Sequence, residues 1–372
     1  MKKNVYMDAA ASWLKPQSVV ESMTDFLTNS YANAGRGVCE RATRVDDLIA
    51  NSRRVVADFI GAKPENIVFT SGATDGLNRV VNILSAQSWY NEKSTFAVSD
   101  LDHHSARLPW ENLLRAGKIG KEFVCDLDEN FNINIDSIPK TDFLIITAMS
   151  NVLGIPQDVE SIIRAARTKN PNVIIVVDAS QFIVHEKIDV KKWDCDFLVF
   201  SGHKIGADTG IGVLYIRDIE KYSPDKFGGG MINKILDNGN WILNNGPEKF
   251  EAGTLPITQI IGLPYAIDYL SKWNGGHDLI KYMYDELSKI PQIKFLTSSD
   301  SCMLTFVVDG MHTLDFGALM GVHNICIRVG NMCASWIHKM LNLDGSIRMS
   351  VGPWNTMDDV KYVVETIRKI VK

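Results

Sequence analysis

The amino-acid sequence predicts an α/β protein in which a mostly parallel, doubly wound sheet is joined to a smaller α+β unit. Short apolar runs with the length of buried strands alternate with helical segments between roughly residues 60 and 260. Several of these runs end in a polar or charged residue, and open α/β sheets bind ligands at their strand ends. A later strand at residues 303–308 and a helix at residues 313–321 predict the second unit.

The spacing of apolar residues along the chain predicts where the helices and strands lie. Amphipathic helical spacing predicts helices, and short uninterrupted apolar runs predict strands that are buried on both faces. The expected helices cover residues 18–27, 44–60 and 260–273, and Asn274-Gly-Gly276 ends the last of these. The expected strands of the large sheet cover residues 64–70, 96–99, 144–150, 173–178, 196–201 and 210–216.

Composition narrows the function classes. The chain has 372 residues, of which 45% are hydrophobic and 22% charged, and its net charge of -5 comes with no dense block of lysine and arginine. We therefore expect neither nucleic-acid binding nor a membrane span, and we expect a cytoplasmic enzyme without an export signal. The six cysteines form no CxxC pair, which argues against a zinc site or a disulfide scaffold.

Two strand ends suggest the chemistry. Residues 196–201 lead into Ser201-Gly-His-Lys204, and residues 173–178 end in Asp178. A desolvated lysine amine is a nucleophile that can form a Schiff base with an aldehyde, and a nearby aspartate can keep a pyridine nitrogen protonated. This pair indicates pyridoxal phosphate, although Lys204 alone would be a surface charge and Asp178 alone could cap a helix.

A turn rich in small residues predicts an anion site. Ser71-Gly-Ala73-Thr74 follows the strand at residues 64–70 and precedes a helical segment. Free backbone N–H groups and the positive end of a helix would face an anion there. The pattern is neither a Walker motif nor GxGxxG, and a plain strand-to-helix turn is the alternative.

These motifs resemble the class V aminotransferase group of fold-type I pyridoxal phosphate enzymes, and within it the group II cysteine desulfurases and selenocysteine lyases. The resemblance runs from Asp8 to Thr356 and rests on Asp178-Ala-Ser-Gln181, Ser201-Gly-His-Lys204 and the Thr209–Tyr215 segment. It implies a seven-stranded sheet, a large cofactor-binding domain at residues 16–260, and a small domain made of residues 1–15 and 261–372.

The resemblance also implies the cofactor contacts. His103 is expected to stack on the ring and assist proton transfer, while the His103-His104 pair lacks the ligand spacing of a metal site, so no metal is expected. Thr254 would touch the phosphate of the partner subunit in a homodimer, although on its own it would be a surface-loop residue. The expected cofactor-binding residues are Ala73, Thr74, His103, Asn151, Asp178, Gln181, Ser201, His203, Lys204 and Thr254.

The segment Arg328-Val-Gly-Asn-Met-Cys333 resembles the Arg-Thr-Gly-His-His-Cys segment of the group II desulfurases. Asn331 and Met332 replace both histidines, and Trp336 stands where the family commonly has proline. Cys333 would be the thiol that accepts sulfur, or else a buried structural cysteine. Arg348, supported by Arg328 and Asn151, would bind the substrate carboxylate through its guanidinium fork.

The leading hypothesis is a pyridoxal phosphate-dependent cysteine desulfurase. It would convert L-cysteine to L-alanine, place the sulfur on Cys333 as a persulfide, and pass it to an acceptor protein or small thiol. Iron–sulfur cluster assembly is one process that uses such sulfur. The alternatives are a selenocysteine lyase or another class V aminotransferase or lyase that does not use Cys333, and a cofactor-binding or sulfur-carrier scaffold without turnover.

Overall fold

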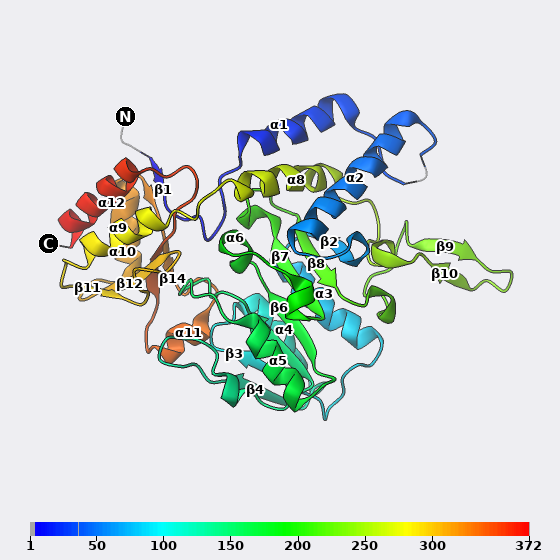
Figure 1. Cartoon of the computed structure of the whole chain (residues 1–372), viewed down its shortest axis with the longest axis horizontal. Helices are drawn as coiled ribbons and strands as arrows, with labels where there is room; N and C mark the ends of the chain where they lie inside the picture. Colours follow the sequence, from blue (N-terminus) through cyan, green and yellow to red (C-terminus); the bar gives the residue numbers. More distant parts are fainter. Residues whose placement is uncertain (1–3, 36, 372) are drawn as a thin grey trace.

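A seven-stranded sheet forms the centre of the molecule (Figure 1). The computed structural model describes residues 4–35 and 37–371. β8 alone runs antiparallel to its neighbours in this sheet, so the predicted mostly parallel α/β fold is confirmed. In spatial order the strands are β2 (Ile67–Thr70), β8 (Gly212–Ile216), β7 (Phe197–Ser201), β6 (Ile174–Asp178), β5 (Phe143–Thr147), β3 (Thr95–Ser99) and β4 (Lys121–Cys125).

Both faces of this sheet are buried, which explains why its strands are nearly continuous apolar runs. Along β6, Ile174 and Val176 belong to one apolar cluster, whereas Ile175 and Val177 belong to the other. Helices α3 (Ala73–Ala86) and α4 (His104–Arg115) contribute to the first cluster. Helices α2 (Glu40–Phe59), α5 (Val159–Lys169) and α8 (Ile257–Ser271), with the short helices α6 (Phe182–His185) and α7 (Val190–Trp193), contribute to the second.

The N-terminal helices pack beside α8. α1 (Gln17–Asp25) continues into a π-helical turn (Phe26–Ser30), and both α1 and α2 contact α8 (Figure 1). The predicted helices at residues 18–27, 44–60 and 260–273 are present, and α2 and α8 begin a few residues earlier than expected. Cys39 and Pro256, which stand at the N-caps of α2 and α8, are not the polar capping residues that mark a helix start in sequence.

A second, four-stranded antiparallel sheet carries the C-terminal part, as expected for an α+β unit. Its order is β11 (Ile293–Phe295), β12 (Leu304–Val308), β15 (Ser346–Met349) and β14 (Arg328–Gly330). β1 (Val5–Tyr6) pairs with β13 (Ile325–Cys326), which attaches the N-terminal strand to this unit. The accompanying helices are α9 (His277–Leu287), α10 (Thr313–Val322), α11 (Ser335–Met340) and α12 (Met357–Ile370).

This unit has its own apolar core, to which Val5 and Met7 contribute. The predicted small domain of residues 1–15 and 261–372 stays a prediction, and residues 1–3 and 372 lie outside the described residues. The boundary between residues 260 and 261 falls inside α8 and stays a prediction.

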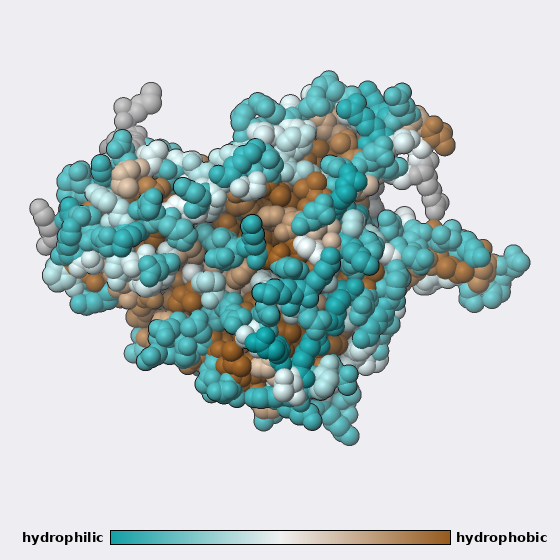
Figure 2. All heavy atoms as spheres, viewed as in Figure 1, coloured by the Kyte–Doolittle hydropathy of each residue, from teal (hydrophilic) through white to brown (hydrophobic). Residues whose placement is uncertain are grey.

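A two-stranded hairpin extends away from the large sheet (Figures 1 and 2). It consists of β9 (Ile232–Ile235) and β10 (Trp241–Leu243), which the sequence analysis did not predict. Ile235, Trp241 and Ile242 are exposed on it, and the Trp241 ring contacts that of Phe227.

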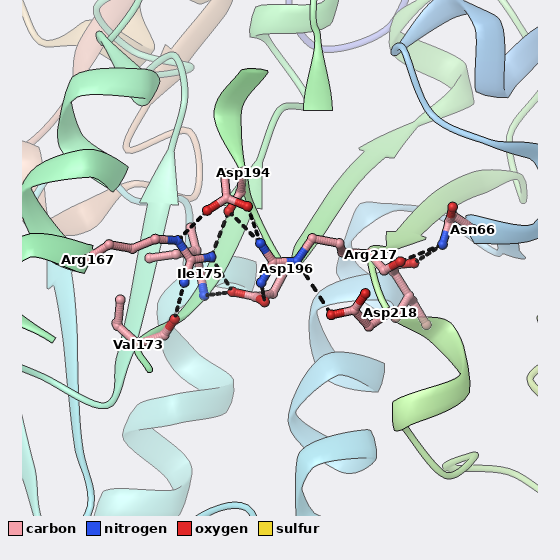
Figure 3. Close-up of polar contacts among 9 residues, drawn as sticks. Asn66, Arg167, Val173, Ile175, Asp194, Asp196, Arg217 and Asp218 are labelled. Atoms are coloured by element: carbon pink, nitrogen blue, oxygen red, sulfur yellow. Dashed lines mark hydrogen bonds and ion pairs between the residues drawn. The ribbon is translucent and has the colours of Figure 1, made fainter. Parts of the chain in front are cut away.

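An ion-pair network lies at the amino edge of the large sheet (Figure 3). Asp196, just before β7, pairs with Arg167 at 3.1 Å and with Arg217, and its Oδ2 accepts the backbone N–H of Ile175 at 2.8 Å. Asp194 also pairs with Arg167 at 2.7 Å and with Arg217. Since Arg217 follows antiparallel β8, these contacts join the ends of three neighbouring strands. Among the described residues, no helix is long and apolar enough to cross a membrane.

Candidate active site

The carboxyl ends of the parallel strands and β14 of the small sheet converge on a cavity of about 270 Å³. Twelve of the residues singled out from the sequence line it, although they come from segments spread over most of the chain. They are Ala73, Thr74, His103, Asn151, Asp178, Gln181, Ser201, His203, Lys204, Arg328, Cys333 and Arg348. The structure therefore brings the predicted amine, carboxylate, imidazole, thiol and guanidinium groups to one place.

Lys204 ends a single 3-10 turn that directly follows β7. Gly202 in this turn packs closely against Ile211, the residue before β8: a Cβ atom on Gly202 would come within 2.8 Å of Ile211 Cγ2. Burial lowers the pKa of Lys204 to about 8, while Asp178 opposes this shift. A substantial fraction of the amine is thus neutral near physiological pH, as a nucleophile requires.

The N-terminus of α3 lies where the sequence predicts an anion site. Gly72 stands at its N-cap with a φ of 152°, and a Cβ atom on Gly212 of β8 would come within 2.5 Å of Gly72 Cα. The backbone N–H of Ala73 donates to Ser201 Oγ at 2.8 Å, and Thr74 Oγ1 lies 2.7 Å from Ser105 Oγ. Hydroxyl groups and the positive helix end therefore face the cavity, where an anion is stabilised.

Asp178 and His103 present a carboxylate and a neutral ring to the same cavity. Asp178 Oδ1 accepts the backbone N–H of Ser180 at 3.0 Å, which orients the carboxylate at the end of β6. His103 caps α4, and its Nδ1 accepts the N–H of Ser105 at 3.1 Å. Burial lowers the pKa of both His103 and His203 to about 4, so both imidazoles are neutral at pH 7.

Asp8, to which the sequence analysis gave no role, binds two arginines that line the cavity. Its carboxylate pairs with Arg328 at 2.5 Å and with Arg348 at 3.1 Å. The remaining terminal nitrogen of Arg348 donates to the carbonyl oxygen of Asn151 at 2.6 Å. Arg348 is therefore not the free fork that was expected, because Asp8 and Asn151 hold its two terminal nitrogens. The resemblance begins at Asp8, but the arginine partners of Asp8 lie more than 300 residues away in the sequence.

Cys333 follows β14 on a short exposed loop. Met332 and Cys333 both have left-handed backbone conformations, with φ of 50° and 55°. Asn151 Nδ2 donates to the Met332 carbonyl oxygen at 2.8 Å, which connects the loop to the turn after β5. An exposed thiol beside the cavity is accessible to a reactant, so the alternative of a buried structural cysteine is wrong.

Of the buried side-chain polar atoms that have no hydrogen-bond partner within the described residues, four belong to residues that line this cavity. They are Asn151 Oδ1, Ser180 Oγ, Gln181 Oε1 and Arg348 Nε, and all four residues line it. Buried polar groups in folded proteins are nearly always satisfied. This concentration marks a surface shaped for a polar ligand.

Thr254 is the one predicted site residue that does not line this cavity. It is exposed and lines a separate cavity of about 790 Å³ together with Arg53 and Glu251. Within the described residues no group of three or more histidine, cysteine, aspartate or glutamate side chains could hold a metal ion.

Comparison with known proteins agrees with this geometry. The aminotransferase class-V family model matches residues 5–363. The chain belongs to this family. It is 33% identical to the probable cysteine desulfurase of Borreliella burgdorferi, over 99% of this chain and 92% of that protein. The Escherichia coli O127:H6 cysteine desulfurase is 30% identical, over 98% and 93% of the two chains.

Solved structures extend the agreement to the fold. The apo structure of the cysteine desulfurase from Thermococcus onnurineus superposes with a TM-score of 0.92 at 32% identity, covering 99% of this chain and 94% of that one. The resemblance drawn from the motifs and the fold that it implied are both confirmed.

Proposed function

We propose that the protein is a pyridoxal phosphate-dependent cysteine desulfurase, in which Lys204 carries the cofactor and Cys333 accepts the sulfur. One observation carries the proposal: Lys204, Cys333 and Arg348 line the same cavity. An amine, a thiol and a carboxylate-binding group within one cavity are what removal of sulfur from an amino acid requires, and transamination needs no such thiol.

The residues around the cavity fit pyridoxal phosphate. The N-terminus of α3, with Ala73, Thr74, Ser201 and His203, would hold the phosphate. The unpartnered Gln181 Oε1 and Asn151 Oδ1 are available to polar groups of a bound ligand. When bound, the cofactor supplies an aldehyde for the amino group and an electron-withdrawing ring, and Asp178 would keep the ring nitrogen protonated.

Arg348 and Arg328 would position L-cysteine. Arg348 Nε is buried and has no hydrogen-bond partner within the described residues, so it would be available to donate to an incoming carboxylate. Asp8 holds both guanidinium groups in place and partly balances their charge before the substrate arrives. Neutral Lys204, whose pKa is lowered to about 8 by burial, can take the proton from Cα of the substrate and return it.

Cys333 would accept the sulfur as a nucleophile. Its thiolate forms a bond to the substrate sulfur while the substrate bond between Cβ and sulfur breaks. The electron pair of that bond stays with carbon, which is protonated to give L-alanine, and the second sulfur remains on Cys333 as a persulfide. No external oxidant or reductant is consumed in this step.

We further propose a homodimer in which Thr254 contacts the phosphate bound to the partner subunit. Thr254 lies outside the cavity of its own chain, and the apolar residues of the β9–β10 hairpin are exposed in a single chain. A sulfur-acceptor protein or a small thiol would then collect the persulfide sulfur from exposed Cys333.

The test is alanine release from L-cysteine by the purified protein and by a Cys333→Ala variant that keeps the visible absorbance of bound cofactor. We expect release from the wild type and none from the variant. A matched Cys326→Ala variant removes another exposed cysteine and should retain wild-type release.

Two outcomes would contradict the proposal. Alanine release that survives in Cys333→Ala would favour a lyase that does not use this thiol. Keto-acid formation with an amino acceptor, without alanine release by the wild type, would favour an aminotransferase.

A further inference from the structure

His103 and His104 are adjacent in sequence, but their side chains contact different parts of the molecule. The ring of His103 lines the cavity, whereas His104 is absent from its lining. The two ring centroids lie 6.2 Å apart. His104 is the first residue of α4, and its contacts are with the segment that carries Cys333.

Three hydrogen bonds join His104 to that segment. Its backbone N–H donates to the carbonyl oxygen of Cys333 at 2.7 Å. Its ring Nε2 accepts the backbone N–H of Ser335 at 3.1 Å and lies 3.0 Å from Ser335 Oγ. Because Nε2 accepts an N–H, it carries no proton, and burial lowers the pKa of His104 in agreement with this neutral state.

Trp336 adds an aromatic contact to these polar ones. The His104 ring meets the Trp336 ring edge to face at 5.2 Å between centroids. The guanidinium carbon of Arg107 lies 4.4 Å from the centroid of the Trp336 ring. Both His104 and Arg107 belong to α4, so the tryptophan of α11 is contacted twice by one helix.

Acidic side chains hold Arg107 in this orientation. Its Nε lies 2.8 Å from Glu122 and 3.0 Å from Glu111, and its Nη1 lies 3.1 Å from Asp100. The Arg107 side chain is buried, so the cation that faces Trp336 has little freedom to move.

The Cys333 loop needs external contacts of this kind. Two successive non-glycine residues, Met332 and Cys333, have φ of 50° and 55°, a left-handed conformation that is unfavourable for residues with a Cβ atom. Beyond the loop, His338 lies 2.9 Å from both Ala334 O and Ser346 Oγ. His104 contacts the backbone of Cys333 and Ser335, which precede His338 in the sequence.

We propose that His104 and Trp336 form a clamp that holds the Cys333 loop against α4, which makes His104 a positioning residue for sulfur transfer. This inference rests on the proposed role of Cys333 as sulfur acceptor. It assigns Trp336 a role in holding this loop against α4. Neither His104 nor Trp336 lines the cavity, so both act through the loop.

The test compares His104→Ala with His104→Gln in the cofactor-loaded protein. The alanine variant removes the acceptor for Ser335 N–H, whereas a glutamine side-chain oxygen can replace Nε2. For His104→Ala we expect kcat for alanine release to fall by about 10- to 100-fold, since small misplacements of a reacting group have effects of that size. The KM for L-cysteine should change by less than about twofold, and glutamine should restore most of kcat.

Amide hydrogen exchange of residues 331–336 supplies a readout that is independent of turnover. The clamp predicts faster exchange of this segment in His104→Ala and near wild-type exchange in His104→Gln. His312→Ala is the control, because the His312 ring likewise accepts a backbone N–H, that of Leu314 at 3.3 Å, but lies at the N-cap of α10. It should alter neither exchange in this segment nor kcat.

Unchanged exchange and kcat in His104→Ala would overturn the clamp while leaving the proposed function intact. If His104→Ala loses its cofactor absorbance, Trp336→Ala replaces it in the same two measurements, and unchanged exchange and kcat there would overturn the clamp. Failure of the proposed function is recognised separately, as alanine release that persists in Cys333→Ala.

Discussion

At the amino edge of the large sheet, Asp194 and Asp196 are paired with Arg167 and Arg217 (Figure 3), whereas the carboxyl edge holds Lys204 near several unpartnered buried polar atoms. Both edges collect charged residues at strand ends. At the amino edge the ion pairs join neighbouring strands. At the carboxyl edge the polar groups line a cavity that can take a ligand. One edge of the sheet therefore contributes to stability and the other to the proposed reaction.

Lys204→Ala should have the largest effect of a change at the carboxyl edge. Loss of the amine should reduce alanine release by more than about 1,000-fold, because no other side chain can replace a covalent nucleophile. The melting temperature of the cofactor-free protein should not fall, since the desolvated amine contributes little to stability. Steady-state assays and thermal unfolding check both parts, with exposed Lys191→Ala as control.

Arg348→Lys tests the geometry of the carboxylate site while keeping the charge. Lysine retains a cation for Asp8 but lacks the planar fork, so kcat/KM for L-cysteine should fall by about 100-fold. Arg328→Lys is the companion variant, and we expect a smaller decrease because its side chain is more exposed. Equal decreases of kcat/KM in the two variants would contradict the assignment of Arg348 as the main carboxylate-binding residue.

Asp196→Ala tests the amino edge. The change leaves Arg167 and Arg217 each without one partner and removes the acceptor for Ile175 N–H. The free energy of unfolding should fall by about 2 kcal/mol, whereas kcat of the folded enzyme should stay unchanged. Asp218→Ala, which removes an exposed pair at 3.9 Å, should have almost no effect on stability.

The smallest predicted effect is a pH dependence of cofactor uptake. Only neutral Lys204 reacts with an aldehyde, and burial lowers the pKa of Lys204 to about 8. The uptake rate of the cofactor-free protein should therefore rise as pH increases from 7 to 9, by about tenfold, and level off above that. Visible absorbance follows the reaction, and Nα-acetyl-lysine corrects for titration of the cofactor itself.

A midpoint of this profile near the ordinary lysine value would contradict the desolvated environment of Lys204. His103 and His203 do not complicate the measurement, because burial lowers the pKa of each to about 4, well below the range examined.

Several elements could be predicted because their signal is local. Buried strands such as β6 and β7 are continuous apolar runs, and such runs occur where both sheet faces are covered. β4 was missed because Lys121 and Glu122 interrupt its apolar pattern at the edge of the sheet. Helix α12 was also missed, although the capping box of Thr356 and Asp359 marks its start.

The sequence by itself determined the strand-end positions of Asp178 and Lys204, since parallel strands place their carboxyl ends at a common edge. Only the tertiary structure decided that Asp8 holds Arg328 and Arg348, and that His104 contacts Ser335 and Trp336. These pairs join segments more than 200 residues apart, and no local periodicity encodes a contact whose partner comes from another element.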